Sequence, residues 1–154
     1  LKSWYGIQEF TFSCWANLES VENNVHQVIE VNAGGDVWHV EYSDGGFMKY
    51  RIRWSSEDNI TLTPNFPVGT WVFVTLVHTG SEAIAYHDGN QVASQSTGGL
   101  VVSTENMFVS VNTTNSVPDA SGGNYQFCNG RLADLRVYDV ALSSDEVNRL
   151  YNSY

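Results

Sequence analysis

The sequence is poor in basic residues and in long apolar runs, and each shortage excludes a class of partner. Lys and Arg total 7 against 17 Asp and Glu in 154 residues, a formal net charge of −10 at pH 7 with neutral His. Nucleic acids and anionic membranes require a basic surface, so neither is expected as a partner. No apolar run approaches the roughly 18 residues of a membrane-spanning helix, so membrane insertion is not expected either.

Cysteine is also scarce, with Cys14 and Cys128 standing far apart in the chain. No Cys-x-x-Cys pair is present, which leaves a zinc or thioredoxin-type site without support. From their positions alone the two residues are either buried thiols or the ends of one long-range disulfide. Closing so long a loop stabilises by roughly 4–5 kcal/mol in the chain-entropy description of disulfides.

What the sequence does contain is a succession of strand-like runs separated by turn residues. The runs occupy residues 9–16, 26–32, 36–42, 47–54, 59–63, 70–79, 82–88, 90–96, 107–112 and 132–138. The pair Asp88-Gly89 between "AIAY" and "NQVA" indicates a tight hairpin, because both residues tolerate positive φ. Many short strands joined by hairpin turns predict an all-β, antiparallel two-sheet sandwich or barrel, formed by a single domain over residues 1–154.

A short helix is predicted after the last strand. Ser143 and Glu146 form a capping box, in which each side chain satisfies an unpaired backbone N–H of the first turn. Val147, Leu150 and Tyr151 follow at helical spacing and make one apolar stripe. A helix this short is not stable alone in water, so we expect it to dock on the sandwich.

Motifs of known catalytic chemistry are missing from the chain. No Gly-x-Ser-x-Gly elbow occurs, and Ser, His and Asp stand in no recognisable arrangement. No Glu is followed two residues later by Asp, so the Glu-x-Asp-x-x-Glu strand that supplies the carboxylate pair of sandwich glycosidases is not found. We therefore expect a domain that is not an enzyme.

The strongest functional signal lies in the two strand-like runs between residues 36 and 54. One face of the predicted hairpin is apolar and aromatic and consists of Trp38, Val40, Tyr42, Tyr50, Ile52 and Trp54. The other face is polar and consists of His39, Glu41, Lys49, Arg51 and Arg53.

The orientation of this hairpin decides how it would bind a ligand. If the aromatic face lies in the core, which we favour, the polar face offers fork-shaped donors to sugar hydroxyls or carboxylates. If the aromatic face lies outside, its rings offer flat platforms to pyranose rings. The plain alternative is that Arg51 and Arg53 pair with Glu41 across the hairpin, worth roughly 0.2–1 kcal/mol per contact. A second candidate site is the long loop 112–124, with Tyr125 beside it as a stacking residue.

Three segments together resemble a laminin-G-like, concanavalin A-like jelly-roll domain. They are "FTFSCW" near the start, "VGTWVFVTLVHTGSEAIAYHDGNQVAS" in the middle and "NGRLADLRVYDVALSSDEVNRLY" at the end. The resemblance covers most of the chain and implies that the last strand pairs with the first. It also implies that the short helix covers an end of the sandwich, and that Trp15 and Trp71 occupy core positions.

The same resemblance has implications for the cysteines and for calcium. If the first and last strands pair, Cys14 and Cys128 become neighbours, and we expect a disulfide between them. Family members often bind a structural Ca²⁺ near the last strand, and Asp134 is the ligand we name for it. The acidic position of the family itself aligns with Ala133, a departure that weighs against this site.

The fold hosts lectins, adhesion modules and enzymes alike, so function must come from the site. We expect a non-catalytic carbohydrate-binding, lectin-like module that tethers a larger extracellular protein to a glycan or polysaccharide. Because the chain begins with Leu1, we expect it to be excised from a larger protein whose other domains are further partners. Two alternatives stay open: a protein-interaction or structural domain of a surface or virion protein, and a glycoside hydrolase or lyase with an unrecognised site.

The ligand-binding residues expected from this reasoning come from the hairpin and from the edge of the long loop. They are Trp38, His39, Glu41, Arg51, Arg53, Trp54 and Tyr125.

Overall fold

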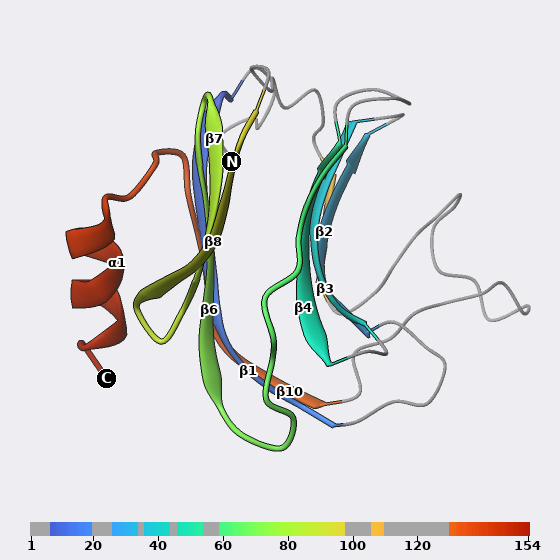
Figure 1. Ribbon diagram of the computed structural model, residues 1–154, viewed down its shortest axis with the longest axis vertical. Coiled ribbons are helices and arrows are strands. Elements are labelled where there is room, and N and C mark those ends of the chain that lie inside the picture. The colour runs from blue at the N-terminus through green and yellow to red at the C-terminus, as the bar shows by residue number, and fades with distance from the viewer. Residues whose placement is uncertain are drawn as a thin grey trace, which may run out of the picture.

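The computed structural model describes residues 7–19, 26–33, 36–43, 46–53, 59–97, 106–109 and 130–154. Within these ranges the chain forms two antiparallel five-stranded sheets that face each other, followed by one short helix (Figure 1). The predicted jelly-roll sandwich with a short C-terminal helix is therefore confirmed.

The first sheet brings together the two ends of the described chain. Its strands in spatial order are β10 (Gly130–Tyr138), β1 (Glu9–Leu18), β6 (Val72–Thr79), β7 (Glu82–His87) and β8 (Asn90–Ser96). β10 pairs with β1 in antiparallel register, which confirms the expected pairing of the last strand with the first. Between β7 and β8, Asp88 and Gly89 have φ values of 49° and 76°, as the Asp-Gly hairpin predicts.

The second sheet contains the hairpin that carries the candidate ligand residues. Its strands in spatial order are β5 (Asn59–Leu62), β4 (Phe47–Arg53), β3 (Asp36–Ser43), β2 (His26–Ala33) and β9 (Asn106–Val109). The middle of this sheet bends toward the first sheet, so its outer side is the concave one (Figure 1). The strands begin and end within a few residues of the predicted runs, because alternating apolar residues mark the half-buried strands.

The core lies between the sheets and is built from alternate residues of each strand. In β1 the inward side chains are the fully buried Phe10, Phe12, Cys14, Ala16 and Leu18. The second sheet contributes buried side chains from its central and edge strands, namely Val28, Ile29, Val40, Tyr42, Met48, Tyr50, Ile52 and Leu62. Among the described residues, this close packing of both inner faces favours the outer faces as the place for a ligand.

Helix α1 (Ser144–Tyr151) lies against the outer face of the first sheet, not over an end of the sandwich as expected (Figure 1). Its buried Val147 packs against Val77 of β6 and Tyr86 of β7. The predicted capping box is present, since Ser143 Oγ accepts from Glu146 N and Glu146 Oε2 accepts from Ser143 N. The outer face of β6 is apolar because this helix covers it.

Neither Trp15 nor Trp71 belongs to the core, which corrects the expectation drawn from the resemblance. Trp15 is half-buried on the outer face of the first sheet, with its ring 5.3 Å from that of Phe73 and 5.9 Å from that of Tyr151. Trp71 is 41% exposed just before β6. Both faces of β6 are buried, one against the core and one under α1, so burial alone does not tell which residues point inward.

Cys14 is fully buried on the inner face of β1, opposite Val74 of β6. On the β10 side the register shifts between Ser13 and Trp15, which leaves Asp134 and Leu135 beside Cys14 at a bulge. The two cysteines were expected to be direct cross-strand neighbours, and this register does not support that argument. Cys128 lies outside the described residues, so the disulfide itself stays a prediction.

Candidate functional site

The β3–β4 hairpin turns its apolar face to the core, as the sequence favours. Val40, Tyr42, Tyr50 and Ile52 are all buried between the sheets. Successive side chains of a strand point to opposite faces, so the described polar residues Glu41, Lys49 and Arg51 belong to the outer, concave side of the second sheet. The pairing register places Glu41 opposite Lys49 and His39 opposite Arg51.

Glu41 and Lys49 form an ion pair on this outer face. Lys49 Nζ lies 2.6 Å from Glu41 Oε1, and the side chain of Glu41 is only 8% exposed against 26% for Lys49. A pair with so little solvent around it is screened less than an ordinary surface pair. The carboxylate that the plain alternative assigned to Arg51 and Arg53 is thus engaged by Lys49.

Arg51 is the other described cation of the face, and it has no such partner. Its side chain is half-buried, its Nε is enclosed by protein, and that atom has no hydrogen-bond acceptor. No ion pair links its guanidinium to any residue that the structure describes. Leaving a buried donor unsatisfied costs about 1–3 kcal/mol, so such a group in a folded protein calls for an explanation.

The remaining predicted ligand residues are not tested by the structure. The structure describes only the backbone of Trp38, His39 and Arg53. In the strand register, Trp38 lies opposite Ile52, His39 opposite Arg51 and Arg53 opposite Val37. Trp54 and Tyr125 lie outside the described residues, as does the loop 112–124. The part of the site that the structure brings together is therefore Glu41, Lys49 and Arg51.

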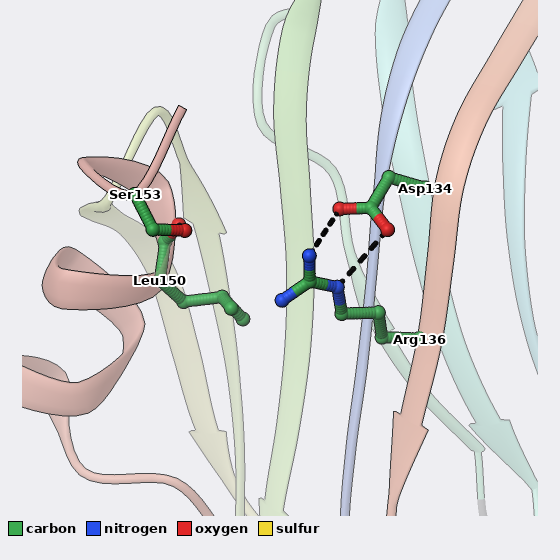
Figure 2. A network of polar contacts seen from close by, with 4 residues as sticks. All are labelled: Asp134, Arg136, Leu150 and Ser153. Carbon is green, nitrogen blue, oxygen red and sulfur yellow. Dashed lines mark hydrogen bonds and ion pairs between the residues drawn. The ribbon is translucent and has the colours of Figure 1, made fainter.

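Asp134, the expected calcium ligand, is engaged by an arginine. Its Oδ1 accepts from Arg136 Nε at 3.0 Å, and its Oδ2 lies 2.7 Å from a terminal nitrogen of the same guanidinium (Figure 2). A carboxylate with both oxygens on an arginine does not fit a Ca²⁺ ligand, which must present its oxygens to the metal. Within the described ranges no group of three or more His, Cys, Asp or Glu is placed to hold a metal.

A second polar pair lies inside the sandwich and joins its two layers. The hydroxyl of Tyr50 and Nε2 of His87 are 2.9 Å apart. Burial lowers the pKa of His87 to about 4, although the nearby Asp88 acts in the opposite direction. Burial also raises the pKa of Tyr50. Both groups are neutral at pH 7, so this contact is a structural bridge and no part of the outer face.

Sequence reasoning left two residues out of its site. Lys49 was recognised as basic but not as the partner of Glu41, although counting back from the hairpin turn pairs the two positions. Trp71 was assigned to the core, and its exposure leaves a large aromatic side chain at the surface of the first sheet. No signal in the mostly apolar run around β6 distinguishes Trp71 from its buried neighbours.

Comparison with known proteins identifies the family. The model of Laminin_G_3, described as the concanavalin A-like lectin/glucanases superfamily, matches residues 2–148. The chain belongs to this family. No curated protein matches the sequence of this Laminin_G_3 domain. In the described ranges no helix is long and apolar enough to cross a membrane.

Solved structures similar to this Laminin_G_3 domain include toxins and a pentraxin. A structure of botulinum neurotoxin type C, whose cell entry depends on two ganglioside molecules, matches with TM-score 0.70 and 16% identity, over 94% of this chain and 35% of the toxin chain. The binding domain of botulinum neurotoxin DC in complex with rat synaptotagmin II matches with TM-score 0.71 and 13% identity, over 99% of this chain and 37% of that one.

The third similar structure is a native heptameric SAP-like pentraxin from Limulus polyphemus. It matches with TM-score 0.70 and 14% identity, over 96% of this chain and 71% of the pentraxin. The domain thus spans little more than a third of each toxin chain but most of the pentraxin. At such identities the likeness shows a shared fold.

Proposed function

We propose that this Laminin_G_3 domain is a non-catalytic carbohydrate-binding module that attaches a larger extracellular protein to a glycan. Its binding surface is the outer face of the β3–β4 hairpin. The observation that carries the proposal is Arg51, a half-buried guanidinium with an unsatisfied donor on the concave side of the sheet. Sugar sites combine a concave surface with a few fixed polar groups, and Arg51 beside the Glu41–Lys49 pair supplies those groups.

The comparisons support a binding role in general terms. The family includes lectins, and the type C neurotoxin that shares the fold interacts with gangliosides. The net charge of −10 disfavours binding to nucleic acids, which are themselves negatively charged, and so favours glycans or proteins as partners. An extracellular location follows from the proposed role, because such glycans are displayed outside the cell.

The test is a glycan array followed by affinity electrophoresis in polysaccharide gels. The wild-type domain is expected to be retained by at least one glycan, and the double variant Arg51→Ala/Arg53→Ala to lose that retention. The matched control is Arg131→Ala/Arg149→Ala, which removes two exposed arginines from the first sheet and from α1. Loss of retention in both double variants would assign the effect to net charge and refute the hairpin site.

The second candidate function is a protein-interaction domain, and one observation favours it. Trp71 and Tyr154 are large aromatic side chains that are 41% and 57% exposed, and neither belongs to the β3–β4 hairpin. Aromatic residues are enriched at protein interfaces. A domain that is retained by no glycan, but whose capture of a partner protein depends on Trp71, would support this function instead of ours.

The third candidate function, that of a glycoside hydrolase or lyase, can be distinguished from binding alone because an enzyme would release a product. Incubation with polysaccharides and a reducing-end assay should detect no release if the module only binds. Steady release, absent from a preparation purified in the same way from a strain without the gene, would overturn the non-catalytic proposal.

A further inference from the structure

On the hairpin face, the ion pair of Glu41 with Lys49 leaves the positive charge of Arg51 without a described carboxylate partner. Glu41 is neutralised by Lys49 at 2.6 Å. Arg51 is alternate to Lys49 along β4, so both point to the same face at roughly 7 Å spacing. In a chain with 17 acidic and 7 basic residues, a cation that meets no carboxylate within the described ranges is an unusual arrangement. Among the described side chains of this face, Arg51 is therefore the uncompensated positive charge.

The guanidinium of Arg51 is partly enclosed by the protein. Nε is the nitrogen of this group that is both enclosed and without an acceptor. Because Nε is enclosed, the two terminal nitrogens are the atoms that we take to meet a ligand. Two parallel N–H groups at the end of a guanidinium match the two oxygens of a carboxylate, and a rigidly held group loses little entropy on binding.

We propose that Arg51 binds the carboxylate of an acidic sugar residue, which makes the ligand of this domain a carboxylated glycan. The proposal rests on the proposed carbohydrate-binding function and specifies its substrate class. A neutral sugar offers only hydroxyls and leaves the charge of Arg51 unbalanced. A densely sulfated polymer is repelled by a domain of net charge −10, whereas a single carboxylate meets one local cation.

The Glu41–Lys49 pair has a positioning role in this site. Glu41 removes the charge of Lys49 from competition, so the carboxylate is directed to Arg51. Replacing Glu41 by Gln frees Lys49 and adds a net positive charge next to Arg51. The variant Glu41→Gln is therefore expected to broaden binding toward sulfated glycans while keeping the carboxylated ones.

The experiment compares each carboxylated glycan with a form in which only the carboxylate is changed. The probes are polygalacturonic acid against its methyl ester, and a sialylated glycan against the same glycan with its carboxyl group reduced. These arms separate uronic from sialic acids, which share the carboxylate chemistry. We expect at least a tenfold weaker binding to the modified form, and binding that weakens as salt is raised.

The variants link that loss to the guanidinium. Arg51→Met removes the charge and the unsatisfied donor at similar volume and is expected to fold at least as stably as wild type, with at least tenfold weaker binding. Arg51→Lys keeps the charge without the fork and is expected to bind between the two. Arg131→Ala, on the other sheet, is expected to bind as wild type does. Thermal melting of each variant confirms folding.

The outcomes distinguish this inference from the function beneath it. Equal binding of a glycan and its esterified or reduced form overturns the carboxylate proposal and leaves the carbohydrate-binding function standing. Binding of no glycan in any form overturns both. Arg51-dependent binding of a poly-Glu peptide without binding of any acidic glycan also overturns both, and assigns the face to a protein partner.

Discussion

The hydroxyl of Tyr50 in β4 lies 2.9 Å from Nε2 of His87 at the end of β7, so one hydrogen bond joins the two sheets of the sandwich. Both partners are neutral at pH 7, because burial raises the pKa of Tyr50 and lowers that of His87. Protonation of His87 would place a charge in this buried contact, and burial opposes it by lowering the pKa of His87 to about 4.

Acid is expected to destabilise the domain through His87. An unfolded histidine has a pKa of about 6.5, so between about pH 6.5 and 4 the unfolded chain binds more protons than the folded one. The contribution of neutral His87 to the free energy of unfolding is fully present above pH 6.5 and is lost as the pH falls to about 4. The loss is on the order of 2–3 kcal/mol after allowance for partial exposure. Urea unfolding at neutral and at mildly acidic pH measures this loss.

The control for this prediction is His87→Gln, which keeps a neutral polar side chain. Burial also lowers the pKa of His78, and that residue remains in the variant. Stability of the variant should therefore fall less with acid than that of the wild type. An equal fall in both proteins would show that His87 does not carry the effect.

Trp71 and Phe73 are expected to differ sharply in their contribution to stability, although they stand two residues apart. Phe73 is fully buried beneath Tyr151 and Tyr154, whereas Trp71 is 41% exposed. Phe73→Ala should cost about 3–5 kcal/mol, and Trp71→Ala under about 1 kcal/mol. Denaturant unfolding of both variants measures the difference, and similar losses would contradict the placement of Trp71.

Gly89 is expected to be intolerant of a side chain for two reasons, and Gly46 for one of them. Both have positive φ, 76° and 84°, which costs a non-glycine residue about 1–2 kcal/mol. A Cβ at Gly89 would also lie 3.2 Å from the ring of Tyr151, whereas nothing lies within 4 Å of one at Gly46. Gly89→Ala should therefore lower the free energy of unfolding more than Gly46→Ala, and the excess measures the contact of the β7–β8 turn with α1. Equal losses of unfolding free energy in the two variants would mean that α1 shifts to accommodate the added methyl group at no cost.

We expect that Asp134 does not contribute to any effect of Ca²⁺ on the stability of the domain. Its two oxygens are engaged by Arg136, so Asp134→Asn should leave any calcium-dependent change in Tm as it is in the wild type. A ligand that binds only the folded state raises Tm, and differential scanning calorimetry with Ca²⁺ or with chelator measures this. A shift present in the wild type and lost in Asp134→Asn would restore Asp134 as a ligand.

Local sequence chemistry predicted most of the fold. Alternation marked the strands, Asp88-Gly89 the tight turn and Ser143 with Glu146 the helix start, because each depends on neighbours in the chain. The position of α1 and the exposure of Trp71 were not predictable in this way. Both follow from which face of β6 receives the helix, and that strand is mostly apolar and is buried on both faces.

The candidate site was predictable as a surface but not in its pairing. Alternation alone separates Glu41, Lys49 and Arg51 from the core residues of the hairpin. Three cations compete for Glu41 in the sequence, and the register that places Lys49 opposite it leaves Arg51 unpaired. The bidentate contact of Asp134 with Arg136 depends on a bulge and a φ of 49°, for which the sequence carries no signal.

The central position of β1 between β6 and β10 bears on how the protein is made. Within this domain β1 leaves the ribosome before the other described strands, and β10, which covers one of its edges, leaves after them. The β6–β7–β8 meander is local and closes early, whereas the β1–β10 pairing must first overcome the entropy of a long loop. Until β10 has emerged, β1 is therefore an open edge strand with an apolar face, and a chain interrupted before residue 130 carries a surface that pairs readily with other chains.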